Sequence, residues 1–557
     1  MKIRIYRLVG AVLVVLVVNA ACSDQAVRPA VSCESLAKLE LREATVTLAE
    51  TVARGAFKAP AQSSDGRSGG PAGRGNAGAP GATGGPGQGG PPSPFQSSGS
   101  TDIVQPAFCR VAVTLKPSGD SDIKMELWLP LEPWNGKFVG VGSFGWGGSI
   151  MYDGLLLGVK NGYAVANNDT GHTDASGGNG AFGLGHPDKV VDYGYRANHE
   201  MTLQAKAIVR AFYGVDPTRS YWVGCSLGGQ QGLTEAQRFP DDYDGIVVGA
   251  PANPIVRLNA WQIWPSLLIN ENPARAIPQA KATMVGDAII NKCDALDGVK
   301  DGILENPLDC AFDPRELQCT GADAPDCLTA PQVDLLRKLY VGPVNSRTGE
   351  SLHAPMVPGA VGNLSGGSPM GVATGLFQNL IFQDPSWDWR TLNMDTDIAF
   401  GEKVLGTVNL ATNPNVKPFF DRGGKLLMYH GWGDGSSPVE SFNYYNAVLK
   451  TVGPSARDAM RVFAVPGMGH CFGGPGCDTF SKLEAIDQWV ETGKAPDRIV
   501  ASKAIDGTVT RTHPLCAYPM VAQYKGTGST DAAESFVCAE AFLCTSAGAL
   551  RSYHNLD

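Results

Sequence analysis

Two segments far apart in the chain each place a cysteine directly beside a residue of a type that acts in catalysis. Residues 224–228 read Gly-Cys-Ser-Leu-Gly, a G-x-S-x-G pattern typical of a tight turn between a strand and a helix, where glycine lets neighbouring backbone pass closely. Residues 469–471 read Gly-His-Cys. If Cys225 and Cys471 are bonded, the serine and the histidine beside them are held together, because bridged Cα atoms lie about 5.5–6 Å apart. We therefore expect a serine hydrolase.

The order of three residues along the chain supports this expectation. A serine hydroxyl is a weak nucleophile until a histidine takes its proton, and the histidine needs a carboxylate to fix its tautomer. Ser226, Asp434 and His470 follow one another in the order used by α/β-hydrolases, each in a glycine-rich turn after an expected strand. Two other histidines lie in the same part of the chain, His172 and His199. Only His172 follows a strand, which makes it a candidate to line the pocket, and neither lies beside a cysteine.

A tetrahedral intermediate also needs two backbone N–H donors. One is expected from Leu227, the residue after the serine. The other is expected from the glycine-rich segment 142–148, where Gly145 is the first choice and Phe144 and Gly147 are alternatives. Glycine in this segment is equally consistent with a tight turn alone.

The composition limits the classes of protein that fit. A chain of 557 residues with 43% hydrophobic residues can bury one large core and an inserted domain. The net charge is −9 and no basic tract is present, which argues against nucleic acid as a partner. Thirteen cysteines favour disulfides in an oxidising compartment, and spacing alone does not give their pairing.

The N-terminus predicts export. Residues 1–21 combine a basic start, an apolar run from Leu8 to Val18 and small residues at the end, as in a signal peptide. The run is shorter than the roughly 20 residues that span a bilayer. Cys22 after two alanines favours a lipid anchor, but Asn19 stands where such sites usually carry leucine or valine, so simple cleavage stays open. We expect a periplasmic protein, an outer-membrane lipoprotein or a secreted protein.

The chain divides into segments of different character. Residues 58–100 are rich in Gly and Pro and predict a disordered insert. Residues 30–255 and 419–557 alternate strands and helices, which predicts an α/β fold with a mostly parallel sheet, whereas 256–418 lack this alternation and predict an inserted lid domain. The expected strands are 110–115, 124–129, 137–141, 163–167, 220–224, 245–249, 424–430 and 461–465, and the expected helices are 198–213, 229–238, 444–452 and 483–490.

A loop in the lid segment carries three carboxylates. Asp294, Asp297 and Asp301 lie within eight residues with glycines between them, and such oxygen ligands suit Ca²⁺. The backbone carbonyls of Val299 and Ile303 can complete the shell. The spacing is not that of an EF-hand, and a solvated acidic turn explains it equally well.

These residues resemble the tannase and feruloyl esterase family of α/β-hydrolases, which includes mono(2-hydroxyethyl) terephthalate hydrolase-like enzymes. The family's hallmark is a Cys-Ser, Asp, His-Cys arrangement with a disulfide between the two cysteines, here Cys225 and Cys471. The resemblance covers about residues 30–545 apart from the Gly/Pro-rich insert. Further matching segments are Trp-Asn-Gly-Lys-Phe at 134–138, Asp-Thr-Gly-His at 169–172, Tyr-Trp-Val-Gly-Cys-Ser at 221–226 and Gly-Ala-Pro-Ala at 249–252.

The resemblance implies a lid that closes over the triad and holds a structural calcium ion through Asp294, Asp297, Val299, Asp301 and Ile303. One departure is Ser-Phe at 143–144, where relatives often have Asn-Gly, and it leaves the second oxyanion donor open. The resemblance implies the disulfides Cys33–Cys109, Cys293–Cys310, Cys319–Cys327 and Cys516–Cys538. It assigns no partner to Cys477 or Cys544, and a bond between these two is one open alternative.

The expected reaction is the hydrolysis of small aromatic esters of the feruloyl, galloyl, chlorogenate or terephthalate type through an acyl-enzyme, with the substrate free or attached to plant polysaccharide. Trp387 and Trp389 in the lid can stack on an aromatic acyl group, or can be core residues of the lid. Two other functions use the same scaffold: a peptidase or amide hydrolase with this triad, and a catalytically silent binding protein.

Overall fold

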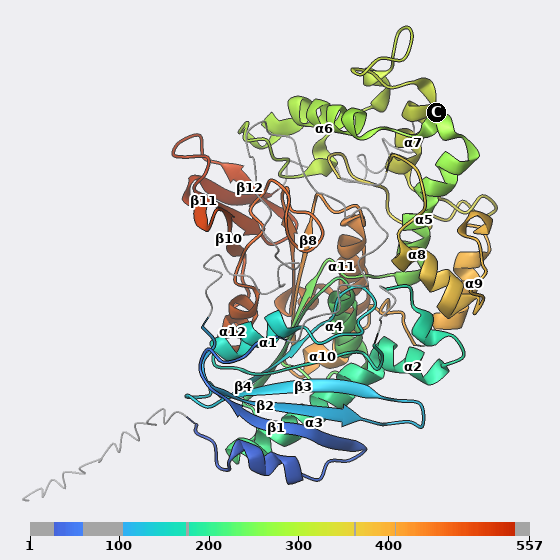
Figure 1. Cartoon of the computed structure of the whole chain (residues 1–557). Helices are drawn as coiled ribbons and strands as arrows, with labels where there is room; N and C mark the ends of the chain where they lie inside the picture. The colour runs from blue at the N-terminus through green and yellow to red at the C-terminus, as the bar shows by residue number, and fades with distance from the viewer. Residues whose placement is uncertain (1–26, 60–103, 174–177, 361–363, 407, 541–557) are drawn as a thin grey trace, which may run out of the picture.

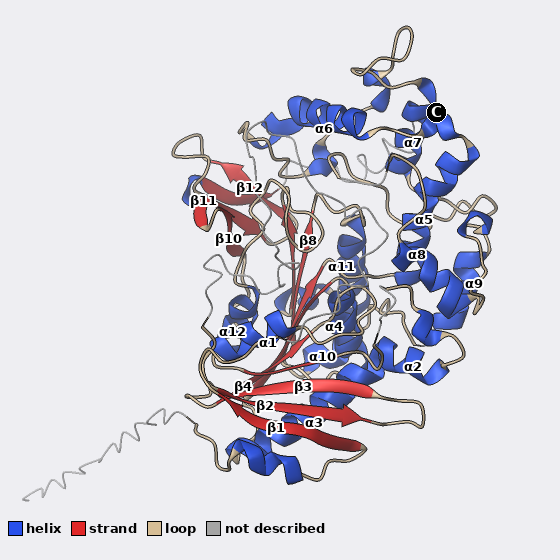
Figure 2. Ribbon diagram, viewed as in Figure 1, coloured by secondary structure: helices blue, strands red, loops and turns tan. Residues whose placement is uncertain are grey.

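The computed structural model describes residues 27–59, 104–173, 178–360, 364–406 and 408–540. They form a central sheet with helices on both faces, a helical insertion at one end and small β-hairpins from the C-terminal part (Figures 1 and 2). The predicted signal peptide, Cys22, nearly all of the Gly/Pro-rich insert and Cys544 lie outside the described residues. Among the described helices, none is both long enough and apolar enough to cross a bilayer.

The central sheet has nine strands in the order β1-β2-β3-β5-β4-β6-β7-β8-β9. The neighbours from β1 to β5 pair antiparallel, and those from β5 to β9 pair parallel. Five of the eight neighbouring pairs are parallel, so the sheet is mostly parallel as the sequence predicts, with an antiparallel edge formed by β1, β2 and β3. The strands are β1 (Ala44–Val52), β2 (Phe108–Leu115), β3 (Ile123–Pro130), β4 (Lys137–Val141), β5 (Ala164–Asn168), β6 (Arg219–Cys225), β7 (Gly245–Gly249), β8 (Lys425–Gly431) and β9 (Met460–Val465).

The apolar sequences of the central strands follow from their burial on both faces of the sheet. β7 is buried at every position and reads as a continuous short run, as a parallel strand covered on both faces requires. In β6, Trp222 packs into the core on one face, while Tyr221 and Val223 pack into the core on the other. Helices α3 and α11 cover the first face, and α1 and α12 cover the second. The helices around the sheet are α1 (Tyr152–Lys160), α2 (Pro187–Val191), α3 (Ala197–Tyr213), α4 (Leu227–Arg238), α11 (Val439–Val452) and α12 (Lys482–Thr492).

The insertion lies between β7 and β8, at the position where the sequence predicts a lid. Its described residues form helices, turns and isolated β-bridges, and Ile289, Leu335 and Leu336 lie in a separate buried cluster. It occupies one end of the molecule, with α6 and α7 furthest from the blue edge strands in Figure 1. The insertion helices are α5 (Ile255–Glu271), α6 (Gln279–Cys293), α7 (Ala330–Val341), α8 (Gly371–Gly375), α9 (Asp397–Leu405) and α10 (Lys417–Asp421).

The C-terminal part, in which the sequence predicts no strand, forms two hairpins. β10 (Arg498–Ile505) pairs with β11 (Thr508–Cys516), and β12 (Met520–Tyr524) pairs with β13 (Phe536–Glu540). The disulfide Cys516–Cys538 joins β11 to β13.

The described segments on either side of residues 60–103 meet at one edge of the sheet. β1 and β2 pair with Thr51 opposite Cys109, and beyond this pair the Gly55 N–H donates to the Gln105 carbonyl at 3.2 Å. The disulfide Cys33–Cys109 fixes the same edge. The two ends of the Gly/Pro-rich insert are therefore neighbours in the fold.

Glycines allow a close approach of backbone beneath the G-x-S-x-G turn. A Cβ atom on Gly142, which follows β4, would lie 2.5 Å from the Cα atom of Gly228 in α4. The Gly228 N–H donates to the Ser143 carbonyl at 2.7 Å. The segment after β4 is thus held directly against the first turn of α4.

We expect Gly142→Ala to lower the free energy of unfolding by about 1–3 kcal/mol, because the added methyl group meets backbone that cannot rotate away. The measurement is the thermal midpoint of the purified variant. Gly286→Ala in α6 is the control, since no atom lies within 4 Å of its Cβ position and alanine favours a helix. Equal midpoints for the two variants would contradict the close approach.

Candidate active site

Ser226 stands between β6 and α4 in a backbone conformation that residues with a side chain rarely adopt, with φ 59° and ψ −120°. Hydrogen bonds hold this turn. The Ser226 N–H donates to the Gly249 carbonyl at 3.0 Å, and the Ser226 carbonyl accepts from the Ala252 N–H at 2.9 Å. The serine side chain is partly exposed. A strained turn that aims a serine outward is the structure of a nucleophile elbow.

Asp434 and His470 form a hydrogen-bonded pair. His470 Nδ1 lies 2.6 Å from Asp434 Oδ2, and the Ser436 N–H donates to Asp434 Oδ1 at 2.8 Å. The Asp434 side chain is 3% exposed and the His470 side chain is 44% exposed. Because Nδ1 faces a carboxylate, it carries the proton, and the lone pair of Nε2 is left free to accept one.

The electrostatics of this pair keep Asp434 ionised and make His470 a stronger base. Burial alone would raise the pKa of Asp434, but the imidazoles of His470 and His430 outweigh it and hold that pKa well below its usual range. Desolvation lowers the pKa of His470, and the charge of Asp434 more than offsets this and raises it above its usual value.

A disulfide connects the serine and histidine loops. Cys225 and Cys471 are bonded, with their Cα atoms 6.0 Å apart and both side chains buried. The other disulfides among the described residues are the four that the family resemblance implies, Cys33–Cys109, Cys293–Cys310, Cys319–Cys327 and Cys516–Cys538. Cys477 is buried and forms no disulfide with a described cysteine, and the proposed partner Cys544 lies outside the described residues.

The segment after β4 supplies candidate oxyanion donors. Leu227 is the first residue of α4, and none of the described residues accepts a hydrogen bond from its N–H. The Gly147 N–H is already used, because it donates to the Phe144 carbonyl at 2.8 Å. The N–H groups of Phe144 and Gly145 have no acceptor in the described part of the chain, and Gly145 is exposed with φ +56°. The geometry therefore leaves Gly145 and Phe144 as candidates and disfavours Gly147.

The other histidines singled out from the sequence have neighbours other than Asp434. His172 is buried and its ring stacks on Phe182 with centroids 3.7 Å apart. His199 Nδ1 lies 2.6 Å from Asp242 Oδ2. Among the lid aromatics, Trp387 packs against Phe377, with centroids 5.8 Å apart, which favours a core role within the insertion.

The insertion shares an apolar cluster with the catalytic part of the chain. Trp146, which follows Gly145, and Leu227, which follows the serine, belong to the same buried cluster as Phe377 and Leu380 of the insertion. The insertion also binds the Asp434 loop, since Trp261 Nε1 in α5 donates to the Gly435 carbonyl at 3.0 Å. It therefore contacts the surroundings of both Ser226 and Asp434.

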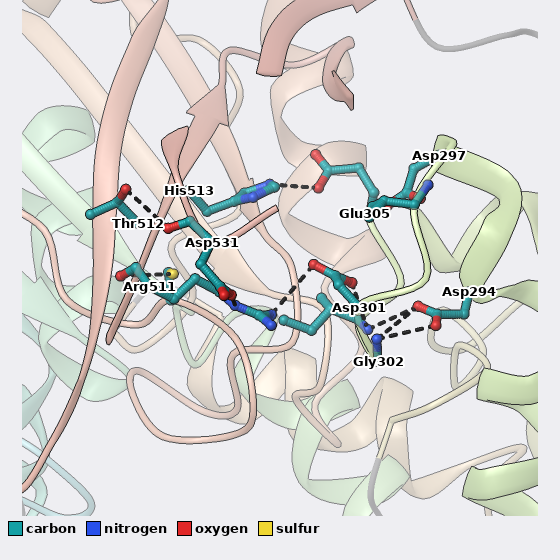
Figure 3. Close-up of polar contacts among 12 residues, drawn as sticks. Asp294, Asp297, Asp301, Gly302, Glu305, Arg511, Thr512, His513 and Asp531 are labelled. Carbon is teal, nitrogen blue, oxygen red and sulfur yellow. Dashed lines mark hydrogen bonds and ion pairs between the residues drawn. The ribbon is translucent and has the colours of Figure 1, made fainter. Parts of the chain in front are cut away.

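The acidic loop of the insertion lies against the C-terminal hairpins, as Figure 3 shows. Backbone N–H groups bind each of its aspartates: Gly302 donates to Asp294 at 3.0 Å, Val299 to Asp297 at 3.0 Å and Ile303 to Asp301 at 3.1 Å. These bonds fix the three carboxylates within one short loop.

A fourth carboxylate, Glu305, joins this cluster, and the sequence analysis missed it. Glu305 Oε2 lies 2.9 Å from His513 Nε2, and Asp301 Oδ2 lies 3.4 Å from Arg511 Nη1. Even with these partners, burial and then the neighbouring carboxylates raise the pKa of Asp297 to about 7. The signal available in the sequence was an acidic residue two positions after Ile303.

The cluster fits a hard cation. Asp297, Asp301 and Glu305 line a cavity of about 10 Å³, close to the space that one water-sized sphere needs. Carboxylates that raise the pKa of a neighbour around one small cavity are stabilised by a bound divalent ion, and oxygen donors suit Ca²⁺. The same cavity is lined by Pro466, at the start of the turn that leads from β9 to His470.

The sequence model of the family described as tannase and feruloyl esterase matches residues 109–539. The chain belongs to this family. It is 34% identical to an uncharacterized esterase of Xanthomonas campestris pv. campestris, over 97% of this chain and 94% of that protein. It is 33% identical to the mono(2-hydroxyethyl) terephthalate hydrolase of Piscinibacter sakaiensis, over 75% of this chain and 81% of that protein.

The solved structure of feruloyl esterase B from Aspergillus oryzae is similar at 30% identity, with a TM-score of 0.77 and coverage of 91% of this chain and 99% of that one. As a member of the tannase and feruloyl esterase family, the chain is a carboxylic ester hydrolase. The comparison also confirms the α/β-hydrolase fold that the sequence predicts.

We expect the double variant Cys225→Ala, Cys471→Ala to lose more stability than Cys319→Ala, Cys327→Ala. The first pair closes a loop with a sequence separation of 246 and the second a loop with a separation of 8. Chain entropy then predicts losses of roughly 5 and 3 kcal/mol, respectively. Denaturant unfolding of the two variants measures the difference. A larger loss for the short loop would show that strain or packing, not loop closure, dominates.

Proposed function

We propose that the protein hydrolyses esters of aromatic acids through an acyl-enzyme on Ser226. The observation that carries this proposal is the Asp434–His470 hydrogen bond of 2.6 Å, on a loop that the Cys225–Cys471 disulfide ties to the Ser226 turn. The disulfide thereby keeps the loop that carries the base, His470, and its carboxylate partner, Asp434, close to the turn of the outward-facing Ser226. These are the groups that acyl transfer needs.

In the proposed mechanism, His470 Nε2 takes the proton of Ser226 as the hydroxyl attacks the ester carbonyl. The N–H of Leu227 and that of Gly145 or Phe144 stabilise the negative oxygen of the tetrahedral intermediate. His470 then gives the proton to the leaving alcohol, and in the second half of the reaction it activates a water molecule that releases the acid. Asp434 keeps the imidazole in the required tautomer throughout.

Two lines of support favour aromatic substrates. The named relatives include a feruloyl esterase and a mono(2-hydroxyethyl) terephthalate hydrolase, whose names specify aromatic esters. In addition, the oxyanion segment continues into an aromatic group, in which Trp146 lies 6.0 Å from Phe182 and 5.3 Å from Tyr193 between ring centroids. Trp146 and Tyr193 are buried, and Phe182 is the half-buried ring of this group, where a flat acyl group suits a flat side chain.

We further propose that the acidic loop binds one structural Ca²⁺ through the carboxylates of Asp294, Asp297 and Asp301 and the carbonyls of Val299 and Ile303. The ion would neutralise the buried carboxylates and so hold the insertion against the C-terminal hairpins and the turn at Pro466. The five disulfides further support the proposed export of the protein, since such bonds persist in oxidising compartments.

Replacement of the nucleophile tests the proposed reaction. We expect Ser226→Ala to lower kcat for p-nitrophenyl and methyl esters of ferulic, gallic and terephthalic acids by about 10⁴-fold or more, with an unchanged thermal midpoint. Labelling by a fluorophosphonate should occur at Ser226 in the natural protein and be lost in the variant. Ester turnover by Ser226→Ala, or labelling at another serine, would contradict the proposal.

Calcium binding predicts a change in stability. We expect chelation to lower the thermal midpoint by about 3 °C or more, and added Ca²⁺ to restore it, because an ion that binds only the folded state stabilises it by mass action. Asp297→Asn should abolish the response. Asp384→Asn is the matched control, since Asp384 is exposed in the same insertion and contacts Ser386 instead. A response that persists in Asp297→Asn would place the ion elsewhere.

A further inference from the structure

We propose that His430 is a second histidine of the active site, a positioning residue that binds the same carboxylate oxygen of Asp434 as His470 does. This inference rests on the proposed function, because it assigns a role within the Ser226, Asp434 and His470 triad. In this assignment, the imidazoles of both His430 and His470 orient the Asp434 carboxylate.

The geometry places His430 directly behind the triad. His430 lies near the end of β8, four residues before Asp434, and its Nε2 is 3.0 Å from Asp434 Oδ2. Its Nδ1 is 2.8 Å from the Oγ of Ser441 in α11. The side chains of His430 and Asp434 are 2% and 3% exposed. Both ring nitrogens therefore have protein partners, and the contact is shielded from solvent.

The partners determine which nitrogen of His430 carries the proton. An ionised carboxylate only accepts hydrogen bonds, so the Nε2 that faces Asp434 is the donor. Nδ1 of the neutral ring is then an acceptor, and the Ser441 hydroxyl donates to it. A continuous chain of hydrogen bonds results, from Ser441 through His430 and Asp434 to His470.

These hydrogen bonds restrict the rotation of the Asp434 carboxylate and spread the negative charge of its Oδ2 over two donors. Oδ2 of Asp434 accepts from His430 and His470, while Oδ1 accepts from the Ser436 N–H. Rotation of the carboxylate would break several bonds to ionised oxygen, each worth about 1.5–3 kcal/mol. Because Oδ2 shares its charge between two donors, it attracts the proton of His470 less strongly than it would alone. His430 thus keeps His470 from becoming too strong a base to release its proton.

Other charged groups near His430 come from the insertion and from α11. His353 contributes an imidazole whose ring stacks on Trp261, with centroids 5.3 Å apart, and Glu440 accepts a hydrogen bond from the Ala354 N–H at 2.6 Å. Burial lowers the pKa of His353, Glu440 opposes this effect, and His430 adds to it. Among the described residues, the two imidazoles that bind Asp434 Oδ2 are those of His430 and His470.

The test is the pH dependence of kcat/KM for an aromatic ester hydrolysed by natural protein, His430→Ala, His430→Gln and Ser441→Ala. We expect His430→Ala to lower kcat about 10- to 100-fold with KM changed less than twofold, and to move the acid limb of kcat/KM up by about 0.5–1 pH unit. His430→Gln keeps an N–H donor and should recover part of kcat. Ser441→Ala should shift the limb in the same direction by a smaller amount.

Two results would overturn the inference. One is a fall in kcat for His430→Ala with the acid limb unmoved, which is what a general loss of packing produces. The other is an unchanged kcat in all the folded variants. If His430→Ala does not fold, Ser441→Ala and His430→Gln decide by the same criteria. His186→Gln is the control, since His186 is exposed and pairs with Asp120 at 3.0 Å, so it should match the natural protein throughout.

The result of the His430 experiment can be distinguished from the result of the Ser226→Ala experiment that tests the proposed function. Loss of turnover in Ser226→Ala establishes the triad whatever the His430 variants do. Turnover that does not depend on Ser226 removes the triad, and with it the basis of the His430 assignment. A Ser226-dependent enzyme whose pH profile ignores His430 contradicts the present inference alone.

Discussion

The bond between Cys225 and Cys471 is the constraint from which the arrangement of the active site follows. A nucleophile elbow fixes the direction of a serine but not the position of its base, which arrives on a loop more than two hundred residues later in the chain. In most hydrolases, packing alone must hold such a loop. Here a covalent link between the immediate neighbours of Ser226 and His470 limits how far the two can separate, even if the surrounding loops move.

Contacts to the Asp434 carboxylate, and contacts from the insertion, limit the other movements of the site. Asp434 is held by two imidazoles and a backbone N–H, and α5 of the insertion binds the next residue of its loop. The acidic loop of the same insertion lies against the turn that follows β9. The insertion is therefore in contact with the catalytic part of the chain at several places. It contacts the segments that carry all three members of the proposed triad.

The central strands could be predicted from local sequence, whereas contacts between side chains distant in the chain could not. β4 and β7 begin and end where the sequence predicts, because strands buried on both faces leave uninterrupted apolar runs. β1, α1 and the four strands β10–β13 were missed. β1 is nowhere fully buried, so its sequence shows no continuous apolar run. His430 and Glu305 were missed for another reason. Each looks ordinary in its own strand or loop and acquires a role only through a partner that the fold brings close.

The neighbouring ends of the Gly/Pro-rich segment have a practical meaning for engineering. Gly55 and Gln105 already share a hydrogen bond at the sheet edge, so the ends are closed by the fold and the length between them costs little. We expect the strand register of β1 and β2 to stay unchanged when that stretch is shortened or a carrier or binding module is fused into it, because the pairing of its flanks is independent of its length. The enzyme thus carries a natural attachment point at the sheet edge opposite β8 and β9, the strands that lead to Asp434 and His470.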